Sequence, residues 1–91
     1  MRYSWDETKQ RKNVKKHKIA FAEAATVFDD PLFVMVADDD HSFSEKRFII
    51  LGKSDRGRLL VVGCADKGTE TRIISARKAT SKERKNYEEE I

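Results

Sequence analysis

The sequence predicts an α+β domain, in which an antiparallel sheet of four to five strands has two N-terminal helices on one face and a helix at its C-terminal end. Apolar residues in the first third of the chain recur at helical spacing. The chain from there to residue 78 consists of short β-forming runs separated by brief turns, which make neighbouring strands antiparallel. Thr80 and Glu83 then form the T-x-x-E capping box that opens a helix. The expected order is strand, helix, helix, four strands, helix.

Length and composition indicate one small domain. The 91 residues are 38% hydrophobic and 38% charged, which provides a modest core under a highly charged surface, so we expect 1–91 to form a single domain. No apolar stretch approaches the ~20 residues of a membrane span, and the N-terminus has no apolar signal core. Cys64, the one cysteine, lies in an apolar run and is expected to pack in the core. These features predict a cytoplasmic protein with no membrane association.

The first helix is predicted to follow a short strand at 2–5. Asp6 is a suitable N-cap, and the helix is expected to reach about His17. Four residues share its narrow inner side: Gln10, Asn13, Val14 and His17. Lys18 or Ile19 ends the helix. If residue 18 adopts a left-handed conformation, lysine costs about 1 kcal/mol relative to glycine.

The clearest helix is predicted at Ala20–Phe28. Its apolar side has i, i+3, i+4, i+7 spacing and consists of Phe21, Ala24, Ala25 and Phe28. The two alanines permit a close approach to a sheet. Pro31 ends the helix, because the residue before a proline disfavours the helical conformation.

Four strands are predicted after this helix, at Leu32–Ala37, Lys46–Gly52, Leu59–Ala65 and Thr69–Lys78. The third of these is the most apolar, so we expect it at the centre of the sheet. An acidic turn at 38–41 and a hairpin turn at 54–57 separate the strands.

One face of the last strand is unsuited to a core. Strand alternation assigns its residues to two faces, with Ile73, Ser75 and Arg77 on one and Arg72, Ile74 and Ala76 on the other. A serine and an arginine beside a single isoleucine fit the floor of an anion-binding groove better than a core.

Arg47, Arg72 and Arg77 are candidate catalytic residues, with Ser75 as a hydrogen-bonding partner. Cleavage of a phosphodiester requires proton transfer and stabilisation of the charge that develops on the phosphate. A guanidinium group suits the second task, because its donors match phosphate oxygens. Arg47 begins one strand and Arg77 ends another, so we expect them at a common edge of the sheet. In the alternative interpretation the arginines form surface ion pairs, with Glu45, Glu70 and Glu83 as the candidate partners.

The segment Lys9–Lys18 contains six basic residues, whereas 88–90 is acidic. This asymmetry predicts a basic surface for a polyanion, with Lys12, Lys15 and Lys16 contacting RNA phosphates. A merely solvated helix face explains the same pattern equally well.

His17 and Tyr87 each have two interpretations. His17 is a candidate general acid or base, because histidine is the usual residue for proton transfer near neutral pH, but packing at the end of the first helix explains it equally well. Tyr87 shares a face of the last helix with Glu83 and Ile91, so we favour packing over stacking on an RNA base.

No metal or nucleotide site is predicted. The acidic turn Asp38–His41 has consecutive residues without the spacing of a calcium loop, so a solvated turn is its better interpretation. The glycines match no phosphate-binding loop. We therefore expect no cofactor.

Three segments together resemble one family. RIISARKATSKERKNY at 72–87 resembles the C-terminal signature of BrnT-type toxins, the toxin half of bacterial BrnT/BrnA pairs. WDETKQRKNVKKHKIAFAEAATVFDDP at 5–31 resembles the N-terminal block of that family, and EKRFIILGKSDRGRLLVVG at 45–63 resembles its middle block. The position after His17 is usually glycine in such sequences, and here it is Lys18.

The resemblance implies a RelE-like fold and a ribonuclease that stops translation. It also implies a BrnA-like DNA-binding antitoxin as partner, in a complex of two toxins and two antitoxins. Because RelE-like toxins use arginines and lysines with few or no catalytic histidines, we expect a metal-independent endoribonuclease. The first alternative is a non-catalytic nucleic-acid-binding module, and the second is a pure interaction protein. Incubation of the purified protein with RNA in excess chelator distinguishes the three. Cleavage supports the enzyme, binding of intact RNA supports the binding module, and neither supports the interaction protein.

Overall fold

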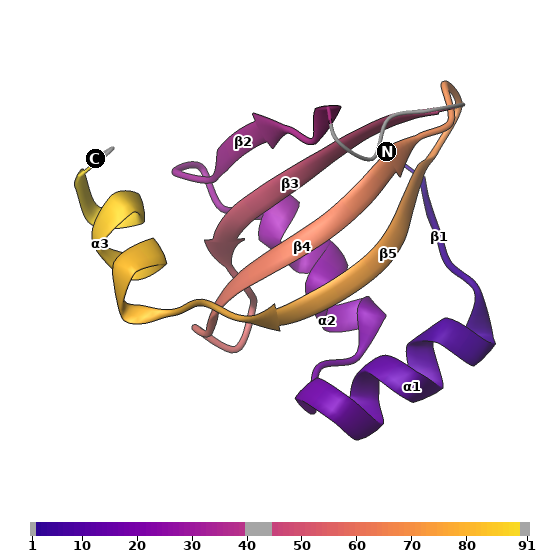
Figure 1. The fold of residues 1–91 in the computed structure, drawn as a ribbon, viewed down its shortest axis with the longest axis horizontal. Coiled ribbons are helices and arrows are strands. Elements are labelled where there is room, and N and C mark those ends of the chain that lie inside the picture. Colours follow the sequence, from indigo (N-terminus) through magenta and orange to yellow (C-terminus); the bar gives the residue numbers. More distant parts are fainter. Residues whose placement is uncertain (1, 40–44, 90–91) are drawn as a thin grey trace.

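The computed structural model describes residues 2–39 and 45–89, and its elements follow the expected order (Figure 1). Asp40 and His41 of the acidic turn, and Glu90 and Ile91 of the tail, lie outside the described residues. The elements are β1 (Tyr3–Ser4), α1 (Glu7–His17), α2 (Phe21–Ala25), the 3₁₀ helix η1 (Thr26–Asp29), β2 (Val34–Ala37), β3 (Lys46–Lys53), β4 (Leu59–Asp66), β5 (Thr71–Lys78) and α3 (Ser81–Glu89). None of the described helices is long and apolar enough to cross a membrane.

The five strands form one mixed sheet in the order β1-β5-β4-β3-β2. Strands β2 to β5 pair antiparallel, as their short connections require, and β4 is central as expected. The expectation of a purely antiparallel sheet is wrong for β1, because it pairs in parallel with β5, with Tyr3 opposite Thr71 and Ser4 opposite Arg72. No tight turn fixes the direction of β1, since two helices separate it from the rest of the sheet.

A β-bulge in β5 changes the expected faces of that strand. Ser75 is opposite Gly63 and Ile73 is opposite Cys64, so Ile74 is an extra residue in the ladder. The bulge inverts the alternation, and Ile73 and Ala76 are both 1% exposed and point into the core. The prediction that Ile73 shares a face with Ser75 and Arg77 is therefore wrong.

The core lies between the sheet and the segment α2–η1, which Figure 1 shows behind the strands. Phe21, Ala24 and Val27 are fully buried against sheet residues such as Ile50, Leu60 and Val62. The predicted stripe contains Ala25 and Phe28 but not Val27; in the structure both are half-buried, and Phe28 packs against the core. The difference arises because the helix tightens into 3₁₀ geometry after Ala25, which turns Val27 toward the sheet.

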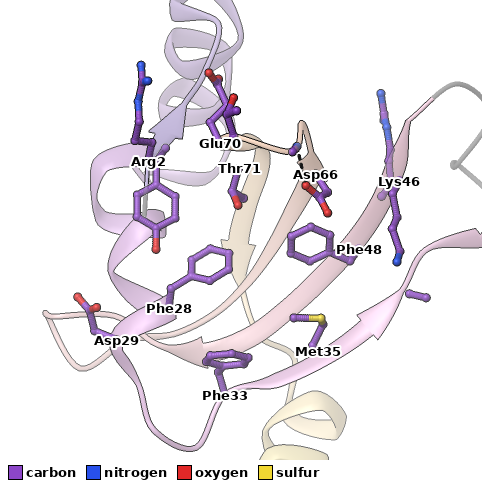
Figure 2. Close-up of a pocket in the computed structure, with 15 residues that line it drawn as sticks. Arg2, Phe28, Asp29, Phe33, Met35, Lys46, Phe48, Asp66, Glu70 and Thr71 are labelled. Carbon is purple, nitrogen blue, oxygen red and sulfur yellow. Dashed lines mark hydrogen bonds between the residues drawn. The ribbon is translucent and has the colours of Figure 1, made fainter.

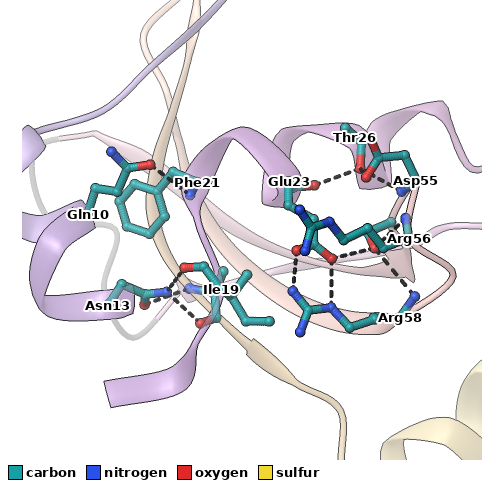
Figure 3. Close-up of polar contacts among 11 residues, drawn as sticks. Gln10, Asn13, Ile19, Phe21, Glu23, Thr26, Asp55, Arg56 and Arg58 are labelled. Atoms are coloured by element: carbon teal, nitrogen blue, oxygen red, sulfur yellow. Dashed lines mark hydrogen bonds and ion pairs between the residues drawn. The ribbon is translucent and has the colours of Figure 1, made fainter. Parts of the chain in front are cut away.

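Helix α1 is attached by a buried amide rather than by apolar packing (Figure 3). Asn13 Oδ1 accepts from Ala76 N at 3.1 Å, and Asn13 Nδ2 donates to Ala76 O and to Ile19 O at 2.9 Å each. Since β1 pairs only with the start of β5, the side chain of Asn13 acts as the missing strand neighbour at Ala76. Val14 is 39% exposed, so its predicted place on the inner side is wrong.

Polar contacts at two residues, Phe21 and Glu23, also fix α2 (Figure 3). Gln10 Oε1 accepts from Phe21 N at 3.1 Å, at the start of the helix. The buried carboxylate of Glu23 accepts from Ser54 Oγ at 2.7 Å and from Arg58, with its Nε at 2.9 Å. The Arg58 contact is the main cause that lowers the pKa of Glu23, so the charge is retained where the β3–β4 turn meets α2.

Lys18 has the left-handed conformation considered above, with φ 62° and ψ 29°. Its backbone N–H donates to Val14 O and closes α1. The chain needs this left-handed conformation at residue 18 to turn sharply from α1 into α2. Lysine is therefore strained at this position.

Replacing Asn13 by alanine should lower the free energy of unfolding by about 3 kcal/mol, because it leaves buried backbone groups of Ala76 and Ile19 without partners. Chemical denaturation measures this loss. Lys12→Ala, on the exposed side of the same helix, should change stability by less than about 0.5 kcal/mol. Equal losses of unfolding free energy in the two variants would show that the Asn13 side chain does not hold α1 to β5.

Replacing Lys18 by glycine should raise the free energy of unfolding by about 1 kcal/mol, because glycine adopts a positive φ without steric cost. Thermal unfolding of the two proteins tests this. The control variant Lys16→Gly, within α1, should instead destabilise the protein, because glycine is unfavourable inside a helix. A neutral or unfavourable Lys18→Gly would show that the side chain stabilises the turn.

Candidate functional site

The surface of the sheet opposite α1 and α2 is termed the open face. Its members follow from the register: Val34 and Val36 of β2, Arg47, Ile49 and Leu51 of β3, Val61, Gly63 and Ala65 of β4, and Arg72, Ser75 and Arg77 of β5. All three candidate arginines and Ser75 thus lie on one surface.

Arg47 and Arg72 flank the same residue of the central strand. Each is opposite Ala65, one from β3 and one from β5. Because neighbouring strands are about 4.8 Å apart, the two Cα atoms are about 10 Å apart. A single phosphate between them is within reach of both long side chains.

Arg77 lies at the other end of this face, opposite Val61. The expectation of a common edge for Arg47 and Arg77 is wrong, because β3 and β5 both pair antiparallel with β4 and therefore run in the same direction. Four residues along the strands and two strands across, at about 3.3 Å and 4.8 Å per step, separate their Cα atoms by roughly 16 Å. Ser75 lies between Arg72 and Arg77.

Ser75 owes its place on the open face to the glycine opposite it. A Cβ atom at Gly63 would lie 2.6 Å from Ser75 Oγ, so no larger residue fits without displacing the hydroxyl. The backbone here forms the floor of a hollow of about 210 Å³ that both Arg47 and Ser75 line. Sequence analysis missed Gly63 as a site residue, although a glycine within the most apolar strand is a signal of close approach.

Arg77 is held by Glu83. Its Nη1 and Nη2 donate to the two carboxylate oxygens at 2.8 and 2.9 Å. Glu83 Oε1 also accepts from Thr80 N at 2.8 Å, which completes the predicted capping box. The guanidinium is the largest cause that lowers the pKa of Glu83 to about 2. The ion pair considered for Arg77 is thus present, and it joins β5 to the start of α3.

Arg47 also has the considered partner, since its Nη2 lies 3.1 Å from Glu45 Oε1. Glu45 is shared with Lys67, whose Nζ lies 2.5 Å away, and Lys67 is the main cause that lowers the pKa of the carboxylate. The end of the open face near Arg47 and Arg72 therefore carries three cations and two carboxylates, because Asp38 lines the same hollow as Arg47. This excess of positive charge suits an anionic ligand.

The remaining predicted site residues lie on helices. Lys12, Lys15 and Lys16 are exposed on α1 and His17 is half-buried in its last turn. None of these four lines the hollow at Ser75. Because Asn13 holds α1 against the outer edge of β5, the lysines lie beyond that edge rather than on the open face.

Tyr87 is a packing residue in this structure. Its side chain is 3% exposed, and its hydroxyl donates to Asp30 Oδ2 at 2.6 Å. Burial, together with this contact, raises the pKa of Tyr87 to about 12. Stacking on an RNA base would require α3 to move away.

A cavity of about 770 Å³ lies on the opposite side of the sheet (Figure 2). Figure 2 shows the rings of Phe28, Phe33 and Phe48 around it. Its rim has mixed charge, with Arg2 and Lys46 facing a set of carboxylates from Asp29, Asp66 and Glu70. Mixed charge gives no attraction for a polyanion, so the open face remains the better candidate. Among the described residues, no three His, Cys, Asp or Glu side chains converge to hold a metal ion.

Comparison with known proteins identifies the family. A family model described as the ribonuclease toxin BrnT of type II toxin–antitoxin systems matches residues 5–83. The crystal structure of the Brucella abortus ribonuclease toxin BrnT superposes with a TM-score of 0.68 at 21% identity, over 89% of this chain and 99% of that one. No curated protein sequence matches the chain. Since the family model spans nearly the whole chain and the fold agrees, the chain belongs to the BrnT family and is a ribonuclease toxin of a type II toxin–antitoxin system.

Proposed function

We propose that RNA binds the part of the open face that carries Arg47, Arg72, Ser75 and Arg77 and is cleaved there without a metal ion. The enzyme is then an endoribonuclease of RelE-like fold, formed by 1–91 as one domain. The observation that carries the proposal is the row Arg47–Ala65–Arg72, with the Ser75 hollow beside it. Two guanidinium groups on either side of a phosphate supply the donors that a transferring phosphate requires.

In this mechanism the adjacent 2′-hydroxyl of RNA loses its proton and attacks the phosphate. The bond to the 5′-oxygen of the next nucleotide breaks, that oxygen takes up a proton, and a 2′,3′-cyclic phosphate remains. Arg47 and Arg72 stabilise the charge that develops, and Ser75 orients a phosphate oxygen by hydrogen bonding. Arg77 binds the neighbouring nucleotide unit, since Ser75 lies between it and Arg72. His17 remains our candidate for proton transfer, since it lies one helical turn after Asn13, the residue that bonds α1 to β5.

The lysines of α1 extend this path. RNA that leaves the open face over the edge of β5 meets α1, because Asn13 is bonded to the outer edge of that strand at Ala76. Lys12, Lys15 and Lys16 are exposed there and contact phosphates without taking part in the chemistry.

The regulation follows from the family. A type II toxin has an antitoxin partner and RNA targets. We infer that the partner is a BrnA-like DNA-binding protein, that two toxins and two antitoxins assemble, and that both act in the cytoplasm, where the RNA lies.

The ion pairs Arg47–Glu45 and Arg77–Glu83 favour one alternative, in which the arginines only stabilise the sheet and the protein binds RNA without cleaving it. Incubation of the purified protein with RNA in excess chelator separates the two. Cleavage supports the enzyme without metal, and retention of intact RNA supports the binder.

Arg77→Ala should reduce the rate of RNA cleavage by about 10²-fold, because loss of the Arg77 contact misplaces the RNA and with it the reacting phosphate. Single-turnover cleavage measures the rate, and circular dichroism verifies the fold. Arg56→Ala, which removes an exposed arginine at the β3–β4 turn, should leave the rate unchanged.

Glu83→Gln separates an RNA contact from a structural role for Arg77. It removes the ion pair and weakens the start of α3, but it keeps the guanidinium. If Arg77 contacts RNA, Glu83→Gln retains cleavage. Equal losses in both variants would assign Arg77 to structure alone.

Replacing Lys12, Lys15 and Lys16 together by glutamine should weaken RNA binding and lower the slope of log K against log salt by about 2, at about 0.7 per phosphate contact on a single strand. Single-turnover cleavage at saturating protein should stay near the wild-type rate. The exposed pair Lys82 and Lys85 on α3, replaced in the same way, serves as control. An unchanged salt slope in the triple variant would remove α1 from the RNA path.

A further inference from the structure

The open face is divided into two chemically different halves. The half around Arg47, Arg72 and Ser75 is basic and polar. The other half, between β2, β3 and α3, is a groove of about 390 Å³. Its floor is purely aliphatic and consists of Val34, Val36, Ile49, Leu51 and Val61. We refer to it as the aliphatic groove.

The floor of this groove extends to the edge of the sheet without a charged residue. Val36 is 56% exposed, and β2 is an edge strand that consists of Val, Met, Val and Ala. Edge strands of soluble proteins usually carry charges or proline, because an apolar edge invites association. An exposed aliphatic surface beside a helix is typical of a site for another protein.

The helix that borders the groove has a distinct charge pattern. Its residues that line the groove are Glu83, Asn86 and Glu89, whereas Lys82, Arg84 and Lys85 do not line it. Glu83 is already paired with Arg77, so the excess negative charge lies at Glu89. This charge is close to the C-terminal end of α3, where the helix dipole adds further negative potential.

These charges restrict the occupant. RNA is repelled by Glu89 and finds no hydrogen-bond donors on the aliphatic floor. A second copy of this chain, related by a two-fold axis, would bring the same acidic rim against itself. The complementary ligand is a protein segment with aliphatic side chains on one side and lysine or arginine beside them.

We propose that the aliphatic groove docks the antitoxin through such an amphipathic basic segment. The proposal rests on the proposed function, which supplies the antitoxin, and adds where and by what chemistry it binds. The aliphatic side chains cover Val36, Ile49 and Leu51, and a basic residue pairs with Glu89. The docked segment ends next to the Arg77–Glu83 pair, at the boundary with the basic half of the face.

Two neighbouring residues provide a matched test. Met35 and Val36 are 57% and 56% exposed on the same strand, but Val36 is opposite Ile49 on the open face and Met35 is opposite Ile50 on the other. The protein encoded by the adjacent gene is titrated into wild type, Val36→Asp and Met35→Asp by calorimetry. Val36→Asp should weaken binding by at least about 30-fold, the effect of a central interface residue, and Met35→Asp by less than about threefold. Glu89→Lys should also weaken binding, and more strongly at low salt.

The outcomes separate this inference from the proposed function. If wild type does not bind the adjacent protein at micromolar concentration, the proposed partner is wrong. If wild type binds and the two aspartate variants bind equally, the partner stands and the groove is not its site. RNA cleavage should be unchanged in Val36→Asp, and its loss would assign the groove to RNA. If the wild-type protein self-associates and Val36→Asp abolishes this self-association, the aliphatic groove binds a second copy of the chain.

Discussion

The outer edge of β5 at Ala76 has a backbone N–H and a C=O that no strand satisfies, and the rest of the structure depends on how they are bonded. Asn13 supplies both partners from one side chain and uses its remaining donor on Ile19 O. This contact places α1 beside the sheet although its inner side is almost without apolar residues. It also fixes the direction in which the chain turns at Lys18 into α2, whose apolar side forms the core. A buried amide can do this where a leucine could not, because the groups to be covered are polar.

The bulge at Ile74 lets one strand serve two incompatible surfaces. Without it, Ile73 and Ala76 could not both face the core, since they are three residues apart. With it, Arg72, Ser75 and Arg77 all reach the open face. Gly63 completes the arrangement by leaving room above the strand for the Ser75 hydroxyl. The chemical character of the open face therefore depends on one inserted residue and one absent side chain.

Local sequence signals predicted the elements well and their relative placement less well. The capping box at Thr80 and Glu83 and the N-cap at Asp6 depend on a few neighbouring residues, and the structure confirms them. The bulge, the parallel pairing of β1 and the 3₁₀ turn that buries Val27 depend on contacts between distant segments, so no local pattern could predict them. The candidate arginines were found from their chemistry. Their relative positions could not be predicted, because the distance between Arg47 and Arg77 depends on the strand directions and the register, which the sequence does not reveal.

The Arg77–Glu83 pair links the open face to the last helix. If RNA takes the proposed path, a phosphate at Arg77 competes with the Glu83 carboxylate that caps α3, so RNA binding opposes the stability of α3. If RNA lowers the affinity of α3 for another ligand by some factor, that ligand lowers the affinity for RNA by the same factor. An inhibitor of this enzyme need not cover the scissile phosphate at all. It needs only to hold a helix in place, and the toxin is then restrained by its own salt bridge.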